Sequence, residues 1–379
     1  MAETARAETV GSLLRPAYLY EARQQLRDGK ITAAELRAVE DRAILEAIEL
    51  QKSAGLDVIT DGEYRRQGWN PSTSYQPNAP FEGYGPAEDY RITYMKFWRD
   101  SSGNIVPRNL GPGTVIKTPL RLRNDIATSE YGFLSQHAGF RTKYTFTAPS
   151  YHRHFWHEKY SSDAYPTVDA YLQAVRDFIR REVVDRVVSL GCDYVQIDAP
   201  NYGQAYTDPD VRAAFEAEGH DLEAELIADA ELDNSLFEGL NGVTRAIHVC
   251  RGNGGGGYWS ASGGYEHLAE QMFPRLTNID TLLLEYDTER AGGFEPLQHV
   301  RRGATVVLGL LTTKSGALED ASAVEGRIRE ATNFVPLENL ALSTQCGFAS
   351  SGAGNPLSFE EQRAKLDLVV STARKVWPS

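Results

Sequence analysis

The sequence predicts an α/β fold, a (β/α)8 TIM barrel, from three observations. Eight short apolar runs end in polar or glycine residues, helical patterns lie between most of them, and 379 residues suit one barrel with insertions. We therefore expect a single domain over residues 1–379. The predicted strands are Glu8–Ser12, Leu56–Asp61, Lys143–Ala148, Tyr194–Asp198, Thr244–Val249, Thr281–Glu285, Ala304–Leu311 and Leu340–Gln345.

Three stretches have the clearest helical pattern. Apolar side chains recur on about one face of Ala33–Ser53, and Gly55 is expected to end that helix. Thr167–Leu190 repeats the pattern. Ser358 to Glu361 has the composition of a helix cap, and it predicts a last helix that ends at Val376.

The segment from about Tyr64 to Phe140 does not fit a minimal barrel. It is rich in Tyr, Trp, Asn, Pro and Gly and has little periodicity, which predicts a long insertion between strands two and three, about residues 64–140. Tyr90–Trp98 is a candidate extra strand within it. Insertions of this length form lids, active-site walls or subunit contacts, so a homodimer interface and a lid both stay open.

Composition excludes several classes of function. A net charge of -13 argues against nucleic-acid binding, which needs clustered positive charge. The chain has no stretch of 18 apolar residues to span a membrane, and its first residues lack the apolar core of a signal peptide. Three widely spaced cysteines do not make a disulfide framework. We expect a cytoplasmic enzyme with reduced thiols that acts on small molecules.

Four side chains that can bind zinc lie at the ends of three predicted strands. His248 and Cys250 are two residues apart and therefore point to the same side, while Glu285 and Cys346 end later strands about one and three βα units away. A His-x-Cys pair alone is more often core, but these matching barrel positions favour a zinc site. Two cysteine ligands favour activation of a thiol, and so transfer of a carbon group to sulfur. Cys192, at the opposite strand end, is expected to be structural.

Carboxylates form a second layer at the same strand ends. Glu63, after strand two, and Asp198, at the end of strand four, suit a cationic group such as a substrate ammonium. The alternative is that they cap helices or pair with Arg65 or Arg66. The histidines of His152–His157 follow strand three and favour substrate contact or a surface position over metal binding.

In their order, these residues resemble the catalytic domain of cobalamin-independent methionine synthase, in its short single-barrel form, among the zinc-dependent thiol alkyltransferases. The resemblance covers nearly the whole chain. It implies zinc bound by His248, Cys250, Glu285 and Cys346, homocysteine as the thiol, and 5-methyltetrahydrofolate as methyl donor. The matching segments are Val10-Gly11-Ser12, Asp57–Glu63, Gln196–Pro200, His248–Cys250, Glu285 and Gln345–Gly347.

The resemblance also implies substrate-binding roles for Gly11, Ser12, Glu63 and Asp198. Glu63 and Asp198 would hold the ammonium and are counted among the catalytic residues. The family has a histidine after strand seven that moves a proton, but this chain has Lys314 in that region. We therefore expect Lys314 to act as the acid or as an anion-binding group.

Three functions follow from these residues. The leading hypothesis is a zinc-dependent methyltransferase that converts homocysteine to methionine with 5-methyltetrahydrofolate or a corrinoid as donor. Asp198-Ala199-Pro200 is also similar to the epoxyalkane:coenzyme M transferases, so zinc-dependent opening of an epoxide by a thiol is the alternative. The third reading is a non-catalytic zinc-binding barrel.

Overall fold

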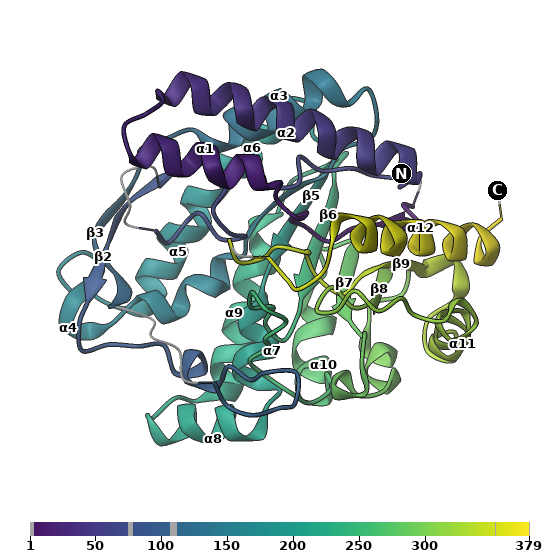
Figure 1. Cartoon of the computed structure of the whole chain (residues 1–379). Coiled ribbons are helices and arrows are strands. Elements are labelled where there is room, and N and C mark those ends of the chain that lie inside the picture. The colour runs from purple at the N-terminus through teal and green to yellow at the C-terminus, as the bar shows by residue number, and fades with distance from the viewer. Residues whose placement is uncertain (1–3, 75–78, 107–111, 353, 379) are drawn as a thin grey trace.

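Parallel strands form one curled sheet, surrounded by helices, in the computed structural model of the chain, which describes residues 4–74, 79–106, 112–352 and 354–378 (Figure 1). Within these ranges the sheet has seven strands in the order β1-β9-β8-β7-β6-β5-β4, and every pairing is parallel. The fold is therefore TIM-barrel-like. The strands are β1 Ala7–Glu8, β4 Tyr144–Thr147, β5 Tyr194–Asp198, β6 Thr244–Val249, β7 Thr281–Glu285, β8 Thr305–Leu311 and β9 Leu340–Thr344.

The second of the eight predicted strands is reduced to one parallel bridge, between Ile59 and Thr142. The residues next to this bridge lack regular strand pairing because side chains form hydrogen bonds with the backbone groups that would pair. The Asp57 carboxylate accepts from the backbone N–H groups of Arg6 and Ala7, and the Gln51 amide bonds both backbone groups of Thr60. Backbone hydrogen bonds from this segment still reach β1 and the residues before β4.

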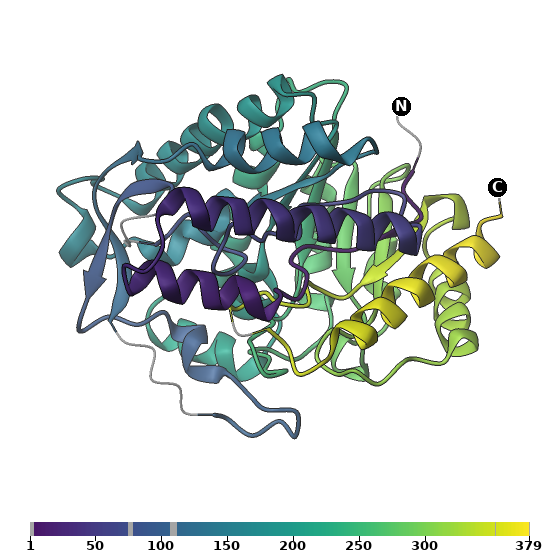
Figure 2. The same cartoon turned by 45° about the horizontal axis from the view of Figure 1, so that its top comes forward.

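Twelve α-helices lie in the described part of the chain, and Figure 2 shows α1 and α2 side by side on its outer surface. The predicted helix at Ala33 is confirmed: Thr32 forms a capping box with Glu35, and Gly55 ends the helix in the left-handed conformation. The helices are α1 Ala17–Arg27, α2 Ala33–Ala54, α3 Ile126–Ala138, α4 Glu158–Ser161, α5 Val168–Ile179, α6 Asp185–Ser189, α7 Pro200–Tyr206, α8 Pro209–Ala217, α9 Leu222–Leu236, α10 Glu266–Met272, α11 Ala321–Ala331 and α12 Phe359–Val376.

The other two predicted helices are also present. The stretch predicted from Thr167 contains α5 and α6, joined by a π-helical turn at Arg180–Val184. Helix α12 begins with the capping box of Ser358 and Glu361 that the sequence predicts.

Residues 64–140 do not form one uniform insertion. An antiparallel ribbon of β2 (Phe81–Ala87) and β3 (Gly113–Leu122) lies in this segment, but α3 packs on α2 and α6 in the layer of helices around the sheet. The extra strand predicted at Tyr90–Trp98 is wrong, because Thr93–Phe97 is a 3-10 helix. Aromatic content and missing periodicity identified this segment as irregular without fixing its conformation.

The interior of the curled sheet is filled by side chains from alternate positions of its strands. The apolar part of this packing consists of Ala5, Val10, Val58, Tyr194, Ala246, Leu283, Val307 and Ala341. Because parallel strands are covered on both faces, they are almost continuous apolar runs in the sequence. None of the described helices is long and apolar enough to cross a membrane.

Candidate active site

Three metal-capable side chains meet at the carboxyl end of the sheet. The ligand atoms of His248, at the end of β6, of Cys250 and of Cys346, two residues after β9, all lie within 4.8 Å of one another, and all three residues are buried. Strands β6 and β9 are far apart in sequence, so the curvature of the sheet brings these side chains together. The structure thus gathers three of the four predicted zinc ligands.

The donor set of this cluster fits zinc. His248 Nδ1 lies 3.1 Å from the carbonyl oxygen of Leu283, to which it donates, so Nε2 is the ring nitrogen that is left to bind a metal. Nε2 is buried and has no hydrogen-bond partner among the described residues. The Cys250 thiol, hydrogen-bonded to Cys346, lowers the pKa of Cys346 well below its usual range. One imidazole nitrogen and two sulfurs are typical zinc ligands.

A cavity of about 130 Å³ lies over the cluster and also contains the predicted substrate residues. Gly11, Ser12, Glu63 and Asp198 line it together with His248, Cys250 and Cys346. They come from the segments after β1, after the reduced second strand and at the end of β5. Side chains chosen from separate parts of the sequence therefore share one pocket.

Glu63 is held in an unusual backbone conformation. Its φ of 59° is in the left-handed region, which no other described non-glycine residue occupies. The hydroxyl of Thr145 donates to Oε1 at 2.7 Å, while Oε2 is buried without a hydrogen-bond partner in the described chain. Burial raises the pKa of Glu63. A strained, buried carboxylate with a vacant oxygen is suited to accept hydrogen bonds from a ligand.

Asp198 and Ser12 present further polar groups to this pocket. Gln196 Nε2 donates to Asp198 Oδ1 at 2.6 Å, and burial raises the pKa of Asp198 to about 7. Ser12 Oγ is buried with no partner among the described residues. Gly347 is required beside it, since a Cβ there would lie 2.5 Å from Ser12 Oγ.

Comparison with known proteins identifies the family. No family model matches the chain. YxjH of Bacillus subtilis (strain 168), described as uncharacterized, is 36% identical over 374 residues, which cover 98% of this chain and 94% of YxjH. The solved structure of a candidate vitamin-B12-independent methionine synthase from Listeria monocytogenes has a TM-score of 0.73 at 27% identity and covers 100% of both chains. This chain belongs to one family with YxjH, and its structure resembles that of the cobalamin-independent methionine synthases.

A more distant relative has a different reaction. The 2-hydroxypropyl-CoM lyase of Xanthobacter autotrophicus (strain ATCC BAA-1158 / Py2) is 23% identical over 323 residues, 78% of this chain and 76% of the lyase. This similarity agrees with the resemblance of Asp198-Ala199-Pro200 to the coenzyme M transferases.

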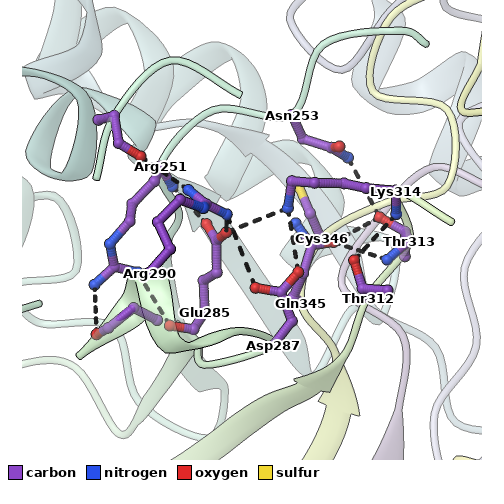
Figure 3. A network of polar contacts seen from close by, with 12 residues as sticks. Arg251, Asn253, Glu285, Asp287, Arg290, Thr312, Thr313, Lys314, Gln345 and Cys346 are labelled. Carbon is purple, nitrogen blue, oxygen red and sulfur yellow. Dashed lines mark hydrogen bonds and ion pairs between the residues drawn. The ribbon is translucent and has the colours of Figure 1, made fainter. Parts of the chain in front are cut away.

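The position of Glu285, the fourth predicted ligand in this family, differs from that of the other three. Its carboxylate lies outside the cluster of mutually close ligand atoms. Oε2 accepts from the backbone N–H of Arg251 at 2.6 Å, and Oε1 accepts from Arg290 at 2.5 Å and from Lys314 at 3.2 Å (Figure 3). Although burial opposes ionisation, Lys314, Arg290 and Arg251 hold the pKa of Glu285 well below its usual range. Zinc ligation by Glu285 stays a prediction.

Lys314, the expected acid, does not line the cavity. The residue follows β8 by three positions, and its ammonium group donates to Glu285 and, at 3.3 Å, to Asp287 (Figure 3). The two carboxylates direct it away from the pocket. In this arrangement Lys314 balances buried negative charge.

The sequence interpretation missed the aromatic wall of the pocket. Trp69, Tyr94, Met95, Trp98 and Tyr151 line the cavity together with the metal-capable side chains. Four of them lie in the irregular segment, where their abundance was the available signal.

Two other expectations have clear outcomes. His152 and His154 are buried, where desolvation lowers the pKa of each to about 3, so a surface position is wrong for both. Neither of them lines the cavity. The hydroxyl of Tyr84 and Nδ1 of His152 form a hydrogen bond of 2.6 Å. Cys192 is buried outside the metal-capable cluster, in agreement with a structural role.

Proposed function

We propose that this protein is a zinc-dependent methyltransferase that transfers a methyl group to a thiol, with homocysteine as the acceptor. One observation carries the proposal. His248, Cys250 and Cys346 share a pocket with Ser12 and Glu63, whose buried polar atoms lack partners in the described chain. An amino acid with a thiol side chain complements both groups of residues. Its sulfur can bind a metal held by the cluster, and its ammonium and carboxylate can bond to Glu63 and Ser12.

The residues of the chain would orient the acceptor. Glu63 Oε2 and the Asp198 carboxylate accept hydrogen bonds from the substrate ammonium, as charge-assisted pairs in a buried site. Ser12 Oγ donates to the substrate carboxylate, next to the backbone of Gly11. The aromatic wall excludes water from the reacting atoms.

A zinc ion held by His248, Cys250 and Cys346, with Glu285 as the predicted fourth ligand, would supply the positive charge that lowers the pKa of a substrate thiol. The ionised sulfur forms a bond to the methyl carbon while the bond between that carbon and the donor breaks. The proton of the thiol leaves to solvent. The protein supplies proximity and orientation, which account for much of the rate acceleration in bimolecular reactions.

The test combines metal content with turnover. We expect about one zinc per chain by mass spectrometry of metals, and methionine from homocysteine with at least one methyl donor. Cobalt substitution adds a second readout, because homocysteine binding should change the visible absorption of the Co²⁺ protein. Unchanged cobalt absorption at saturating homocysteine would exclude the proposed thiol site.

Thiol attack on an epoxide is the second candidate, supported by the similarity to 2-hydroxypropyl-CoM lyase. Coenzyme M carries a sulfonate, which needs a cationic partner. No Lys or Arg is among the described residues that line the pocket, and this favours the amino acid thiol. Product formation from coenzyme M and epoxypropane, with no methionine from any donor, would reverse the preference.

A further inference from the structure

The pocket has an aromatic wall that the acceptor thiol does not need. Trp69 and Tyr151 pack edge to face with ring centroids 4.8 Å apart, and Tyr94 and Trp98 are buried beside them along the cavity. The backbone N–H of Trp69 donates to the carbonyl of Ser350 at 2.9 Å. Ser350 Oγ in turn lies 3.5 Å from the sulfur of Cys346, so the segment that holds Trp69 also contacts the metal-capable cluster.

Carboxyl and thiol groups are the most frequent ionisable side chains of the cavity. Among the described residues that line it, Glu63, Asp198, Cys250 and Cys346 are acidic, His248 is a candidate metal ligand, and there is no Lys or Arg. A donor with a glutamate tail would bring carboxylates that find no cationic partner here. A cation, by contrast, is attracted both by the acidic groups and by the faces of the aromatic rings.

The cavity also has a modest volume, about 130 Å³. Homocysteine, with its eight non-hydrogen atoms, would occupy part of it, and a small donor suits the space that is left.

Among the described residues that line the cavity, no carboxyl group or lysine is left over to protonate a leaving group. Lys314 is bound to Glu285 and Asp287 outside the cavity, and Glu63 and Asp198 are assigned to the substrate ammonium. A nitrogen anion would need a proton as it departs. A neutral dialkyl sulfide, which leaves from a sulfonium ion, needs none.

We propose that the methyl donor is a small methylsulfonium cation bound against the aromatic wall of Trp69, Tyr94, Trp98 and Tyr151. The inference rests on the proposed thiol methylation. The acceptor sulfur forms the new carbon–sulfur bond, and the bond between the methyl group and the positive sulfur breaks. Its electron pair stays on the departing sulfur, so the products are methionine and a neutral sulfide, and no oxidant or reductant takes part.

The first experiment compares donors on the zinc-loaded full chain with homocysteine as acceptor. Trimethylsulfonium, 5-methyltetrahydrofolate and methylcobalamin are supplied separately, and methionine and dimethyl sulfide are measured by mass spectrometry. We expect equimolar methionine and dimethyl sulfide with trimethylsulfonium, and inhibition of this reaction by tetramethylammonium. Homocysteine binding to the Co²⁺ protein without methionine from trimethylsulfonium overturns the inference, whichever other donor works. Failure of homocysteine to bind overturns the proposed function and the inference together.

The second experiment tests the wall without turnover. Tetramethylammonium binding to the zinc-loaded protein is followed by tryptophan fluorescence, and Trp69→Leu is expected to raise its Kd and the KM for trimethylsulfonium about fivefold. Trp69→Phe should restore most of the loss, and the KM for homocysteine should stay unchanged in both variants. Trp377→Leu, at the end of α12 and outside the cavity, is the matched control. Equal effects of Trp69→Leu and Trp377→Leu, or no binding of tetramethylammonium to the unsubstituted protein, contradict the proposed role of the wall.

Discussion

Buried polar groups have hydrogen-bond partners at one end of the sheet interior, whereas several of them lack partners at the other end. Toward its amino end, Lys143 donates to Glu8 Oε2 at 2.6 Å and to the carbonyl of Thr9 at 2.8 Å, and Tyr194 donates to Glu8 Oε1 at 3.1 Å. At the carboxyl end, buried atoms of Ser12, Glu63 and His248 lack protein partners within the described chain. Both ends are buried, so burial alone does not distinguish structure from function.

The difference teaches where a ligand is expected. A buried polar atom without a partner carries a desolvation cost of about 1–3 kcal/mol, and such atoms are rare in folded proteins. Several of them around one cavity indicate that binding completes their hydrogen bonds. At the amino end, Glu8, Lys143 and Tyr194 already bond to one another, and the following predictions test this contrast.

The largest effect is expected for Cys346→Ser. Loss of one sulfur from the cluster should reduce bound zinc to near zero and methyl transfer to background, because the metal then has too few ligands. The fold itself should remain intact. Metal analysis and methionine formation measure the two quantities. Cys192→Ser, which removes a buried cysteine elsewhere, should keep full zinc content. Full zinc content in Cys346→Ser would separate this residue from the metal.

Substitutions at the amino end of the sheet should lower stability and not activity. Lys143→Met leaves the Glu8 carboxylate buried without its cation, and we expect the free energy of unfolding to fall by about 3–5 kcal/mol. The double variant Glu8→Leu/Lys143→Met should recover most of this loss, since no charge remains uncompensated. Urea unfolding measures both variants. A specific loss of activity in folded Lys143→Met would show that this end also serves the reaction.

Much of the site was predictable from the sequence because strand ends are predictable. His248, Cys250 and Cys346 each lie at or just after the end of an apolar run, and in parallel barrels the ends of such runs converge at one end. The same reasoning placed Glu63 and Asp198 at the pocket. These predictions depend on backbone periodicity alone.

The parts that the sequence could not give depend on side-chain partners. Gln51 and Asp57 bind backbone groups that an eighth regular strand would have used. Lys314 follows β8 as expected, yet its long side chain turns to Glu285 and Asp287. Such choices are settled by tertiary contacts between distant segments, which no local pattern encodes.

The cost of burying polar groups near the carboxyl end of the sheet should also be visible in the pH dependence of the free energy of unfolding. Burial, with a contribution from Glu130, raises the pKa of Asp61 to about 7, against an unfolded value near ~3.9. Between these values unfolding releases a proton, so this group's contribution to stability is full below pH ~4 and is lost as the pH rises to about 7. Asp61→Asn removes this titration and keeps an oxygen for the backbone N–H of Glu63. We expect the variant to gain roughly 2–4 kcal/mol relative to the unsubstituted protein between pH 4 and pH 8, measured by urea unfolding. A constant difference across this range would contradict the assignment.

The smallest effect, and the most specific, is expected for Glu63→Gln. The amide keeps an oxygen for the Thr145 hydroxyl but removes the charge that faces the substrate ammonium. The KM for homocysteine should rise about 10- to 100-fold, the range for a lost hydrogen bond to a charged group. The matched control is the acceptor 4-mercaptobutyrate, which has the thiol and the carboxylate of homocysteine at the same spacing but no ammonium. Its KM should be the same in both proteins, because the lost charge has no partner on this acceptor. An equal rise in KM for both thiols would mean that Glu63 maintains the structure of the pocket and does not bind the amino group.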